Sequence, residues 1–519
     1  MSIRRFWAFS GFLAAAFLAC LILSTSAGAG MVTYTFGDDT GDWGYPTPHR
    51  RYARGPGYVR MSYLFDTLTW KNEAGEVIPA LAKKWEYLDG EKAYVFNLDP
   101  KVRWHDGKAF SAGDVLFTIQ YDKKHPTPWV NLKNVVRVER IGTQTVKIFL
   151  KEKDASFLTD IAGTLALLPK HIWEKVGESR KFEGEKALVG TGPFRLLDYN
   201  RTQGSYLYEA NRSYYGGRVI VDRVKFIKVA AEMIPAALKQ GFVDAGPVPA
   251  DLVNPTKQAG FQVIQAPYGW NLKLVMNHKQ PPLNDKSFRQ ALVYAIDRER
   301  LVEIIQRGHA VAGNPGFVPP DSPWFNPRVK KYDFNPDQAK ALLQGAGYTF
   351  QHGKFLKNGS PLILELLSQP RFKEVGIYVK NQLERLGIQI ELRSLEPKTL
   401  DSRVLTWKFQ LAISGHGGLY EPSFLTRRIL GNDFNSVRYR RNEELVAALQ
   451  AQLQEMNPQR RKQIVFRIQE LYAEDVPNLT LYYPNWYYAH NGRFRIHYIR
   501  NGISIGIPLP LSKMAFVEK

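Results

Sequence analysis

A strand–helix–strand pattern in the second half of the chain constrains the fold more than any other feature. Residues 362–367 are predicted to form a strand and residues 374–386 a helix, which Gly387 ends. Residues 388–392 then alternate apolar and polar side chains, as a second strand does. Two strands joined through a helix run parallel in one sheet, so the chain is predicted to be an α/β protein.

The first half of the chain has strand and helix signals of its own. Residues 87–98 are predicted to form a hairpin that turns at Asp89-Gly90. Ser111 and Asp114 have the spacing of a capping box, which predicts a helix through Tyr121. Another helix is predicted to open at residues 335–343 and to close near residues 345–347.

Residues 285–308 predict two consecutive helices. Apolar residues recur at helical spacing between Phe288 and Ile296, so one face of the first helix points to a core. Asp297 is predicted to cap the second helix, which Gly308 stops. Arg289 and Tyr294 lie outside the apolar set, and the periodicity does not explain them.

The first thirty residues predict export. Arg4 and Arg5 precede an apolar run from Phe6 to Leu23, and residues 27–29 offer the small side chains of a cleavage site after Ala29. An uncleaved anchor is the alternative, because the run could just span a bilayer. Lipidation of Cys20 and twin-arginine export through Arg4-Arg5 are two further alternatives. The favoured prediction is a periplasmic protein with no stable membrane span after cleavage.

Length and cysteine content limit the mature protein. The chain has 519 residues, and what remains after export exceeds a single core, so two or three domains are expected. Cys20 is the only cysteine. Cleavage after Ala29 would leave no thiol for a disulfide, a thiolate metal site or a cysteine nucleophile. No cofactor is expected.

The charge balance is strongly basic, with a formal net charge of +21. Nucleic-acid binding is one interpretation, with arginines near residues 438–441 and 460–462 as patches. Asp and Glu are interspersed throughout, so these arginines are predicted to lie on solvated helix faces and loops. No nucleic-acid partner is expected, and the charge favours an anionic ligand or surface.

Several motifs occur in a characteristic order along the mature chain. None of them is catalytic, and each is weak alone. They are residues 63–68, 81–85, 104–107, 112–115, 190–194, 211–217, 236–245 and the helix pair at 285–308. Because these motifs occur in this order behind an export signal, the chain resembles the bacterial extracellular solute-binding proteins of family 5. Those proteins are the peptide- and nickel-binding components of ABC importers.

The resemblance implies a fold of periplasmic-binding-protein type II: two α/β lobes with a hinge, and an inserted third domain. The crossing segments between the lobes are expected near residues 274–277 and 481–484. The expected division is as follows: signal peptide 1–29; lobe I 30–67, 189–277 and 483–519; inserted domain 68–188; lobe II 278–482.

The resemblance also implies binding rather than catalysis. A monomer would capture a peptide-like or small organic solute in the cleft between the lobes, close around it, and deliver it to a membrane permease. Separate ATPase subunits would hydrolyse ATP, since the sequence has no Gly-x-x-x-x-Gly-Lys-[Ser/Thr] loop.

The expected ligand loop of lobe II departs from the family pattern. Residues 414–422 place Gly418 where peptide-binding members carry the aspartate that holds the peptide α-ammonium, and His416 where they carry a tryptophan. Either the ligand has no free amino end here, or another carboxylate such as Asp38 or Asp39 replaces the aspartate. Gly417 and Gly418 are expected to offer backbone N–H groups, and His416 a donor that becomes cationic near pH 6.

Aromatic residues from separate stretches are expected to line the cleft, because rings give large contact areas at low entropic cost. Core packing is the alternative for Trp43 and Trp486. The predicted ligand-binding residues are Asp38, Trp43, Trp270, Asn271, His416, Gly417, Gly418, Tyr420 and Trp486.

Two other functions are weighed. Residues 502–506 fit the Gly-x-Ser-x-Gly elbow of serine hydrolases, but no histidine follows Ser504 as that fold requires. A nickel or metal-chelate receptor of the same fold is the runner-up. His171 and Glu174 share a helical face, yet no histidine spacing resembles a dedicated metal site, so no metal ligands are predicted.

Overall fold

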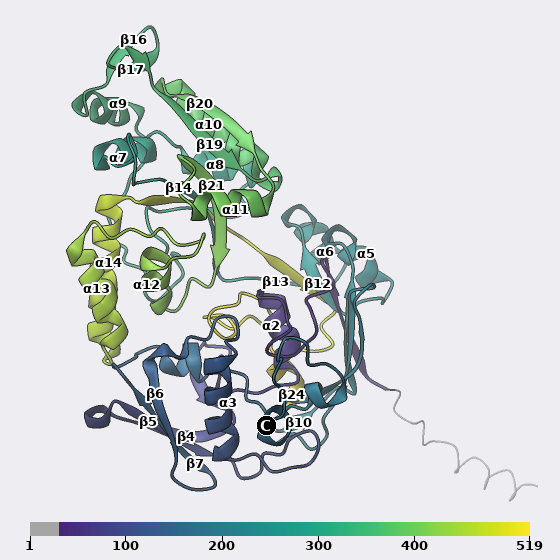
Figure 1. The fold of residues 1–519 in the computed structure, drawn as a ribbon. Coiled ribbons are helices and arrows are strands. Elements are labelled where there is room, and N and C mark those ends of the chain that lie inside the picture. Colours follow the sequence, from purple (N-terminus) through teal and green to yellow (C-terminus); the bar gives the residue numbers. More distant parts are fainter. Residues whose placement is uncertain (1–30, 519) are drawn as a thin grey trace, which may run out of the picture.

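The computed structural model describes residues 31–518, so the predicted export signal, its cleavage site and Cys20 lie outside the described residues. Two mixed sheets with helices form an upper and a lower lobe, and a third group of strands lies below (Figure 1). This arrangement is the two-lobe α/β fold that the strand–helix–strand pattern and the resemblance predict. No described helix has both the length and the apolar character that a membrane crossing needs.

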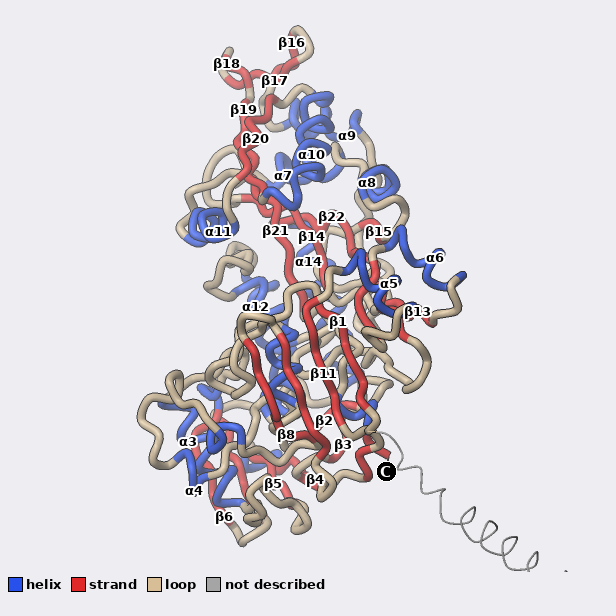
Figure 2. The backbone as a smooth tube through the Cα atoms, turned by 90° about the vertical axis from the view of Figure 1, so that its right-hand side faces the viewer, coloured by secondary structure: helices blue, strands red, loops and turns tan. Residues whose placement is uncertain are grey.

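Lobe I is built on a sheet of seven strands, of which β8, β11 and β1 run side by side in Figure 2. In sheet order they are β13 (Gln262–Gln265), β23 (Tyr487–His490), β12 (Ala245–Val248), β1 (Thr33–Asp38), β11 (Arg223–Lys228), β9 (Ser205–Ala210) and β8 (Phe194–Asn200). Strand β1 is parallel to both β11 and β12. The helices of this lobe are α2 (Gly55–Ser62), α5 (Ile234–Lys239) and α6 (Val253–Gln258).

Lobe II is built on a sheet of six strands. In sheet order they are β15 (Ala310–Ala312), β22 (Asn478–Pro484), β14 (Trp270–Met276), β21 (Leu411–Gly417), β19 (Ile363–Ser368) and β20 (Gln389–Ser394). The predicted strand–helix–strand unit is confirmed: β19 and β20 are parallel, and α10 (Lys373–Leu386) joins them. Gly387 ends α10 with a φ of 110°, a conformation that glycine adopts without strain.

The remaining helices of lobe II surround this sheet. They are α7 (Lys286–Tyr294), α8 (Arg298–Ile305), α9 (Pro336–Gly345), α11 (Pro397–Leu405), α12 (Ser423–Leu430), α13 (Glu443–Gln454) and α14 (Pro458–Asp475). Asp297 caps α8 through its carboxylate, as predicted, and Asp285 caps α7 in the same way. A small hairpin extends from the tip: β16 (Thr349–Gln351), β17 (Lys354–Lys357) and β18 (Ser360–Pro361).

Arg289, which periodicity left unexplained, supports the end of α14. Its guanidinium is buried and donates to the carbonyl oxygens of Asp475, Val476 and Leu283 at 2.6 to 3.1 Å. The last carbonyls of a helix lack partners within the helix, so a buried cation stabilises them. The ring of Tyr294 packs against Tyr332, 4.9 Å away between centroids.

A smaller unit lies between α2 and β8 in the sequence. Its strands are β2 (Thr69–Lys71), β3 (Val77–Pro79), β4 (Ala82–Leu88), β5 (Ala93–Leu98), β6 (Val135–Arg140) and β7 (Thr145–Leu150), and its helices are α3 (Ala112–Lys124) and α4 (Lys170–Trp173). The predicted hairpin is the β4–β5 pair, and the capping box of Ser111 and Asp114 opens α3. We keep the name inserted domain for residues 68–188; the domain division itself stays a proposal.

The chain passes between the two sheets twice, at residues 266–269 and 485–486. The expected crossing at residues 274–277 falls instead within and just after β14, which pairs with β21 and β22 in lobe II. Residues 481–484 lie in β22 of the same sheet. Both crossings are therefore shifted toward lobe I, because β14 and β22 extend the lobe II sheet up to the hinge.

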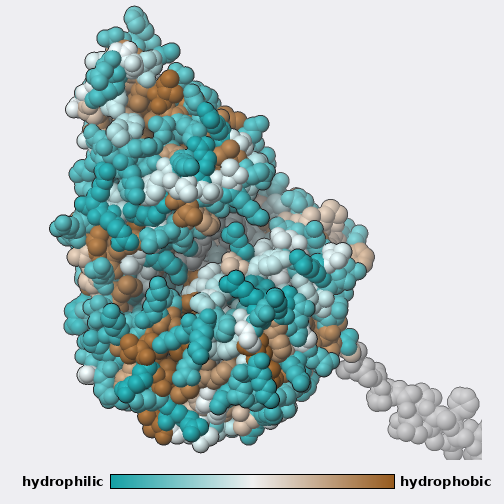
Figure 3. Space-filling view, in the orientation of Figure 1, coloured by the Kyte–Doolittle hydropathy of each residue, from teal (hydrophilic) through white to brown (hydrophobic). Residues whose placement is uncertain are grey.

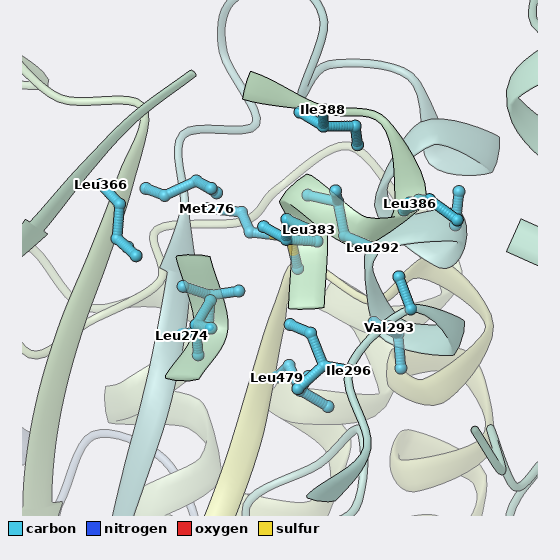
Figure 4. Close-up of a cluster of buried hydrophobic side chains, with 14 of the residues drawn as sticks. Leu274, Met276, Leu292, Val293, Ile296, Leu366, Leu383, Leu386, Ile388 and Leu479 are labelled. Atoms are coloured by element: carbon cyan, nitrogen blue, oxygen red, sulfur yellow. The ribbon is translucent and has the colours of Figure 1, made fainter. Parts of the chain in front are cut away.

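Lobe I, lobe II and the inserted domain each have a hydrophobic core. The core of lobe II packs α7, α8 and α10 against β14, β19 and β22, and Figure 4 shows Leu274 and Leu366 of the sheet near Leu292 and Leu383 of the helices. Lobe I has a core rich in tyrosine and phenylalanine, and the inserted domain has a third core. Such burial holds each part without a disulfide.

Lobe II also touches the inserted domain away from the hinge. The amide of Ala155 donates to the carbonyl oxygen of Leu453 at 2.8 Å, and Ser423 donates to Asp160 at 2.6 Å. Met456, in the turn between α13 and α14, packs against the core of the inserted domain. The C-terminal strand β24 (Val517–Glu518) pairs with β10 (Arg218–Val219) in lobe I. Lobe II is thus linked to lobe I through the hinge and to the inserted domain through these contacts.

Candidate functional site

A pocket of about 430 Å³ lies at the junction of the lobes. Its lining comes from both lobes and from one crossing. Residues 247–251 run from the end of β12, residues 305–307 and His309 from the end of α8, and residues 484–487 include the crossing at 485–486. The space-filling view is also hollowed at the level where the lobes meet (Figure 3). Ligands of open α/β sheets bind outside the carboxyl ends of strands, which is where residues 247–251 lie.

Aromatic rings form one rim of this pocket. Trp486 lines the pocket and is 38 % exposed, and its ring centroid lies 5.8 Å from that of Trp270. Trp270 in turn lies 6.3 Å from Phe372, at the start of α10. A β-carbon on Gly415 would lie 2.1 Å from the Trp270 indole, so glycine at that position makes room for the ring. Trp270 and Trp486, two of the predicted aromatic residues, therefore lie side by side although they belong to different crossings of the hinge.

Charged groups from both lobes lie beside this rim. Arg371 precedes Phe372 and its guanidinium lies over that ring at 4.5 Å. Burial lowers the pKa of Arg371, and the positive charge of Arg54, at the start of α2, lowers it further. Burial raises the pKa of Asp401, and Arg54 and Arg371 oppose that rise. Two arginines and one carboxylate thus face each other between the lobes.

His416 is not the cationic hydrogen-bond donor that the sequence predicts. Its ring is buried, packs against Phe317 at 5.4 Å, and neither ring nitrogen has a hydrogen-bond partner among the described residues. Burial lowers the pKa of His416 well below its ordinary value, and the charges of Lys273 and Arg428 lower it further. The prediction of a cationic donor near pH 6 is therefore wrong, because the sequence does not show that this face of β21 is covered.

The two glycines that follow are also less available than expected. The amide of Gly418 donates to the carbonyl oxygen of Gly269 at 3.0 Å, and Gly417 pairs with Trp270 in the β14–β21 ladder. Gly418 has a φ of 81°, which glycine adopts readily. The Gly418 amide is therefore used in the turn between β21 and the first crossing, and the expectation that it is free for a ligand is wrong.

Asp38 and Trp43 are bonded to each other. The Trp43 indole N–H donates to Asp38 at 2.8 Å, and the buried Arg60 forms an ion pair with the same carboxylate oxygen at 2.5 Å. The amides of Thr40 and Gly41 donate to the other oxygen. The carboxylate of Asp38 thus has partners on both oxygens, which favours a structural role for it over replacement of the missing aspartate.

Two more of the predicted residues are buried with intramolecular partners. Asn271 donates to Thr480 at 2.8 Å, and the Tyr420 hydroxyl donates to Asp321 at 3.0 Å. Burial and the Asp321 carboxylate raise the pKa of Tyr420 far above its ordinary range. These side chains position the loop around His416. Whether any of the nine predicted residues binds a ligand stays a proposal.

The serine-hydrolase motif forms a closed loop rather than an elbow between a strand and a helix. Ser504 is buried, and its hydroxyl pairs with Thr164 at 2.8 Å. Within residues 31–518 no group of three or more His, Cys, Asp or Glu side chains is arranged to hold a metal ion. His171 is paired with Asp106 at 2.6 Å.

Sequence reasoning missed Arg371, Phe372 and the pocket residues around Pro249 and His309. Arg371 and Phe372 follow directly after strand β19, and residues 247–251 follow β12. The rule that ligands meet the carboxyl ends of parallel strands could have found them once these strands were predicted. His309 follows Gly308, and its Nδ1 forms a hydrogen bond with the Tyr487 hydroxyl at 3.2 Å across the hinge. The two residues are far apart in the sequence, so no local pattern predicts this contact.

Residues 76–435 match the family of bacterial extracellular solute-binding proteins, family 5, in its middle region, and the chain belongs to that family. It is 29 % identical over 454 residues to the oligopeptide-binding protein AppA of Bacillus subtilis, covering 81 % of each chain. It is 27 % identical over 483 residues to a putative ABC transporter peptide-binding protein of Brucella ovis, covering 89 % of each.

The crystal structure of NikZ from Campylobacter jejuni in complex with Ni(L-His) has the same fold. Its TM-score is 0.76 at 24 % identity, over 94 % of this chain and 99 % of that one.

Proposed function

We propose that this protein is the substrate-binding component of an ABC importer and captures a small peptide-like or organic solute between its lobes. The observation that carries the proposal is the pocket at the hinge, which takes its lining from both lobes and one crossing. A ligand there touches surfaces that move relative to one another when the hinge bends, so binding stabilises the closed arrangement. A permease and ATPase subunits would be its partners after export to the periplasm, and the protein would act by binding without catalysis.

The proposed ligand carries an anionic group. Arg371 of lobe II lies over Phe372 at the aromatic rim, and the positive charge of Arg54 in lobe I acts on Arg371. Asp401 is the carboxylate that opposes this charge at Arg371. A carboxylate between two arginines would form charge-assisted hydrogen bonds and relieve their mutual repulsion. Since His416 is buried and uncharged and Asp38 is already paired with Arg60, the amino end of the ligand is absent, blocked or turned elsewhere.

Titration calorimetry with a matched pair of probes tests this proposal. At pH 7, N-acetyl-dialanine with a free carboxylate should bind at least roughly tenfold more tightly than its C-terminal amide. Arg371→Gln should remove the difference, whereas Arg385→Gln, an exposed arginine at the end of α10, should preserve it. Equal binding of acid and amide to the unaltered protein would contradict the anionic group, and binding of neither probe would contradict the peptide-like ligand.

A metal chelate is the second candidate. His309 lines the pocket, and the similar NikZ structure was determined with Ni(L-His). An imidazole in the pocket could complete the coordination of a chelated ion. Nickel with excess histidine should then raise the melting temperature of the protein but not that of His309→Asn. Unchanged melting of both proteins would discard this candidate.

A further inference from the structure

Residues 502–507 form a small closed loop, which we call the plug. Ile503 and Ile507 exchange two backbone hydrogen bonds at 2.8 and 3.0 Å, and the loop is mostly buried. Gly502, Ser504 and Gly506 all have positive φ angles. A β-carbon on Gly502 would lie 2.4 Å from the carbonyl carbon of Gly506, so the loop closes this tightly only with glycine there. The plug therefore has one well-defined shape.

The inserted domain anchors the plug from below. The Lys71 ammonium is buried and donates to the carbonyl oxygens of Ser504 at 2.6 Å and Gly502 at 3.4 Å. The Ser504 hydroxyl pairs with Thr164 at 2.8 Å. A buried ammonium needs strong acceptors to offset its desolvation, and two plug carbonyls supply them. Lys71 thus positions a loop that lies more than four hundred residues away in the sequence.

Lobe II and the first crossing cover the other side of the plug. A β-carbon on Gly418 would lie 3.3 Å from the carbonyl oxygen of Ile505, and one on Gly506 would lie 3.2 Å from the α-carbon of Gly418. Pro508, directly after the plug, lies closer still to the first crossing: a β-carbon on Gly269 would lie 2.7 Å from the Pro508 β-carbon. In Figure 1 the yellow C-terminal coil lies at the centre of the molecule, between α12 and α2. The end of the interlobe space at Gly418 is thus filled by protein.

We infer that the plug closes this end of the interlobe space and confines the ligand to the pocket of about 430 Å³ at the hinge, with Lys71 as its positioning residue. This inference rests on the proposed function and adds a limit on ligand length. The pocket volume lies in the lower part of the range for small-molecule sites, so we expect a short ligand to fit it better than an extended peptide of several residues. A side chain at Gly418 would be tight against the plug, in addition to the strain of its positive φ.

A ligand-free measurement tests the contact first. Gly418→Asp should lower the melting temperature by several degrees more than Gly260→Asp. Gly260 also has a positive φ, 90°, but a β-carbon there meets nothing within 4 Å, so it reports the backbone strain alone. Equal losses for the two variants would show that the plug does not press on Gly418 and would overturn the inference.

A length series then tests the limit. N-acetylated alanine peptides of two and five residues are titrated against the unaltered protein, Lys71→Met and the exposed control Lys84→Met. The unaltered protein and the control should bind the dipeptide at least roughly tenfold more tightly than the pentapeptide, and Lys71→Met should narrow that gap by gaining affinity for the pentapeptide.

Equal affinities for both lengths in the unaltered protein would overturn the length limit. An unchanged gap in a folded Lys71→Met variant would overturn the positioning role of Lys71. Binding of neither length would count against the proposed function instead, and the melting comparison of Gly418→Asp with Gly260→Asp would still decide whether the plug is seated on lobe II.

Discussion

Trp270 and Trp486 show how single residues from distant parts of the chain make one surface. Trp270 follows the first crossing between the lobes and Trp486 lies in the second, and each alone is an ordinary aromatic residue in the sequence. In the structure their rings lie 5.8 Å apart, and Trp486 also lines the pocket. His416 shows the opposite outcome. Histidine is a residue type that often binds ligands or protons, but this ring packs against Phe317, and burial, with a smaller effect of Lys273 and Arg428, lowers its pKa well below the ordinary value.

At the residue scale, Trp486→Ala should weaken binding of N-acetyl-dialanine about threefold to tenfold and change the melting temperature little. The reason is that the ring is 38 % exposed and gives its contact area to the pocket rather than to the core. Calorimetry and thermal melting measure the two effects. Trp85→Ala in the inserted domain, whose ring packs against that domain's core, should do the reverse. A large loss of stability in Trp486→Ala would assign that ring to packing.

At the scale of elements, local signals describe most helices well. Asp285 and Asp297 cap α7 and α8, and the capping box opens α3, because these side chains satisfy backbone amides of their own first turn. Gly387 ends α10 for a local reason and a tertiary one. Its φ of 110° favours glycine, and a β-carbon there would lie 2.8 Å from the Phe350 ring and 3.0 Å from the Gly353 carbonyl oxygen.

Gly387→Ala should therefore destabilise the protein more than a positive φ alone requires. Gly359→Ala serves as the comparison, because Gly359 has a φ of 78° and a β-carbon there meets nothing within 4 Å. We expect a cost of about 1–2 kcal/mol for Gly359→Ala and an additional cost of about 1–3 kcal/mol for Gly387→Ala. Urea unfolding followed by circular dichroism measures both. Equal losses in the free energy of unfolding would mean that the hairpin carrying Phe350 moves away from the new β-carbon at no energetic cost.

At the scale of the whole molecule, buried histidines link folding to pH. Burial lowers the pKa of His105 and of His278 to about 4 each, and a backbone carbonyl at 3.0 Å faces one nitrogen of either ring. His105 joins the inserted domain to the segment at Gly190 and Gly192, and His278 joins β14 to the strand-like segment at Val437. Protonation of either ring would place an uncompensated charge between parts of the fold.

Stability should therefore fall on acidification. Both pKa values lie below the value of about 6.5 in the unfolded chain, so the unfolded state binds protons first. The stabilisation is complete above pH 6.5 and is lost as pH falls toward 4, by about 2 kcal/mol per ring at pH 5. Urea unfolding at pH 7.5 and 5 should show a smaller loss for His105→Asn than for the unaltered protein. His352→Asn, an exposed control, should behave as the unaltered protein does. Identical losses in all three proteins would contradict this linkage.

The sequence by itself determined the α/β class, the β19–α10–β20 unit, the caps of α3 and α8, and the family. These features depend on side-chain period and on contacts within a few residues, which a linear pattern records. Only the tertiary structure decided where the chain crosses between the lobes, that His416 and the Gly418 amide are covered, that Trp486 lines the pocket, and that Arg371 lies over Phe372. Those outcomes depend on which distant segment lies against each position, such as the plug at residues 502–507 against Gly418. The burial and the pKa of a side chain are set by that neighbour rather than by the residue type.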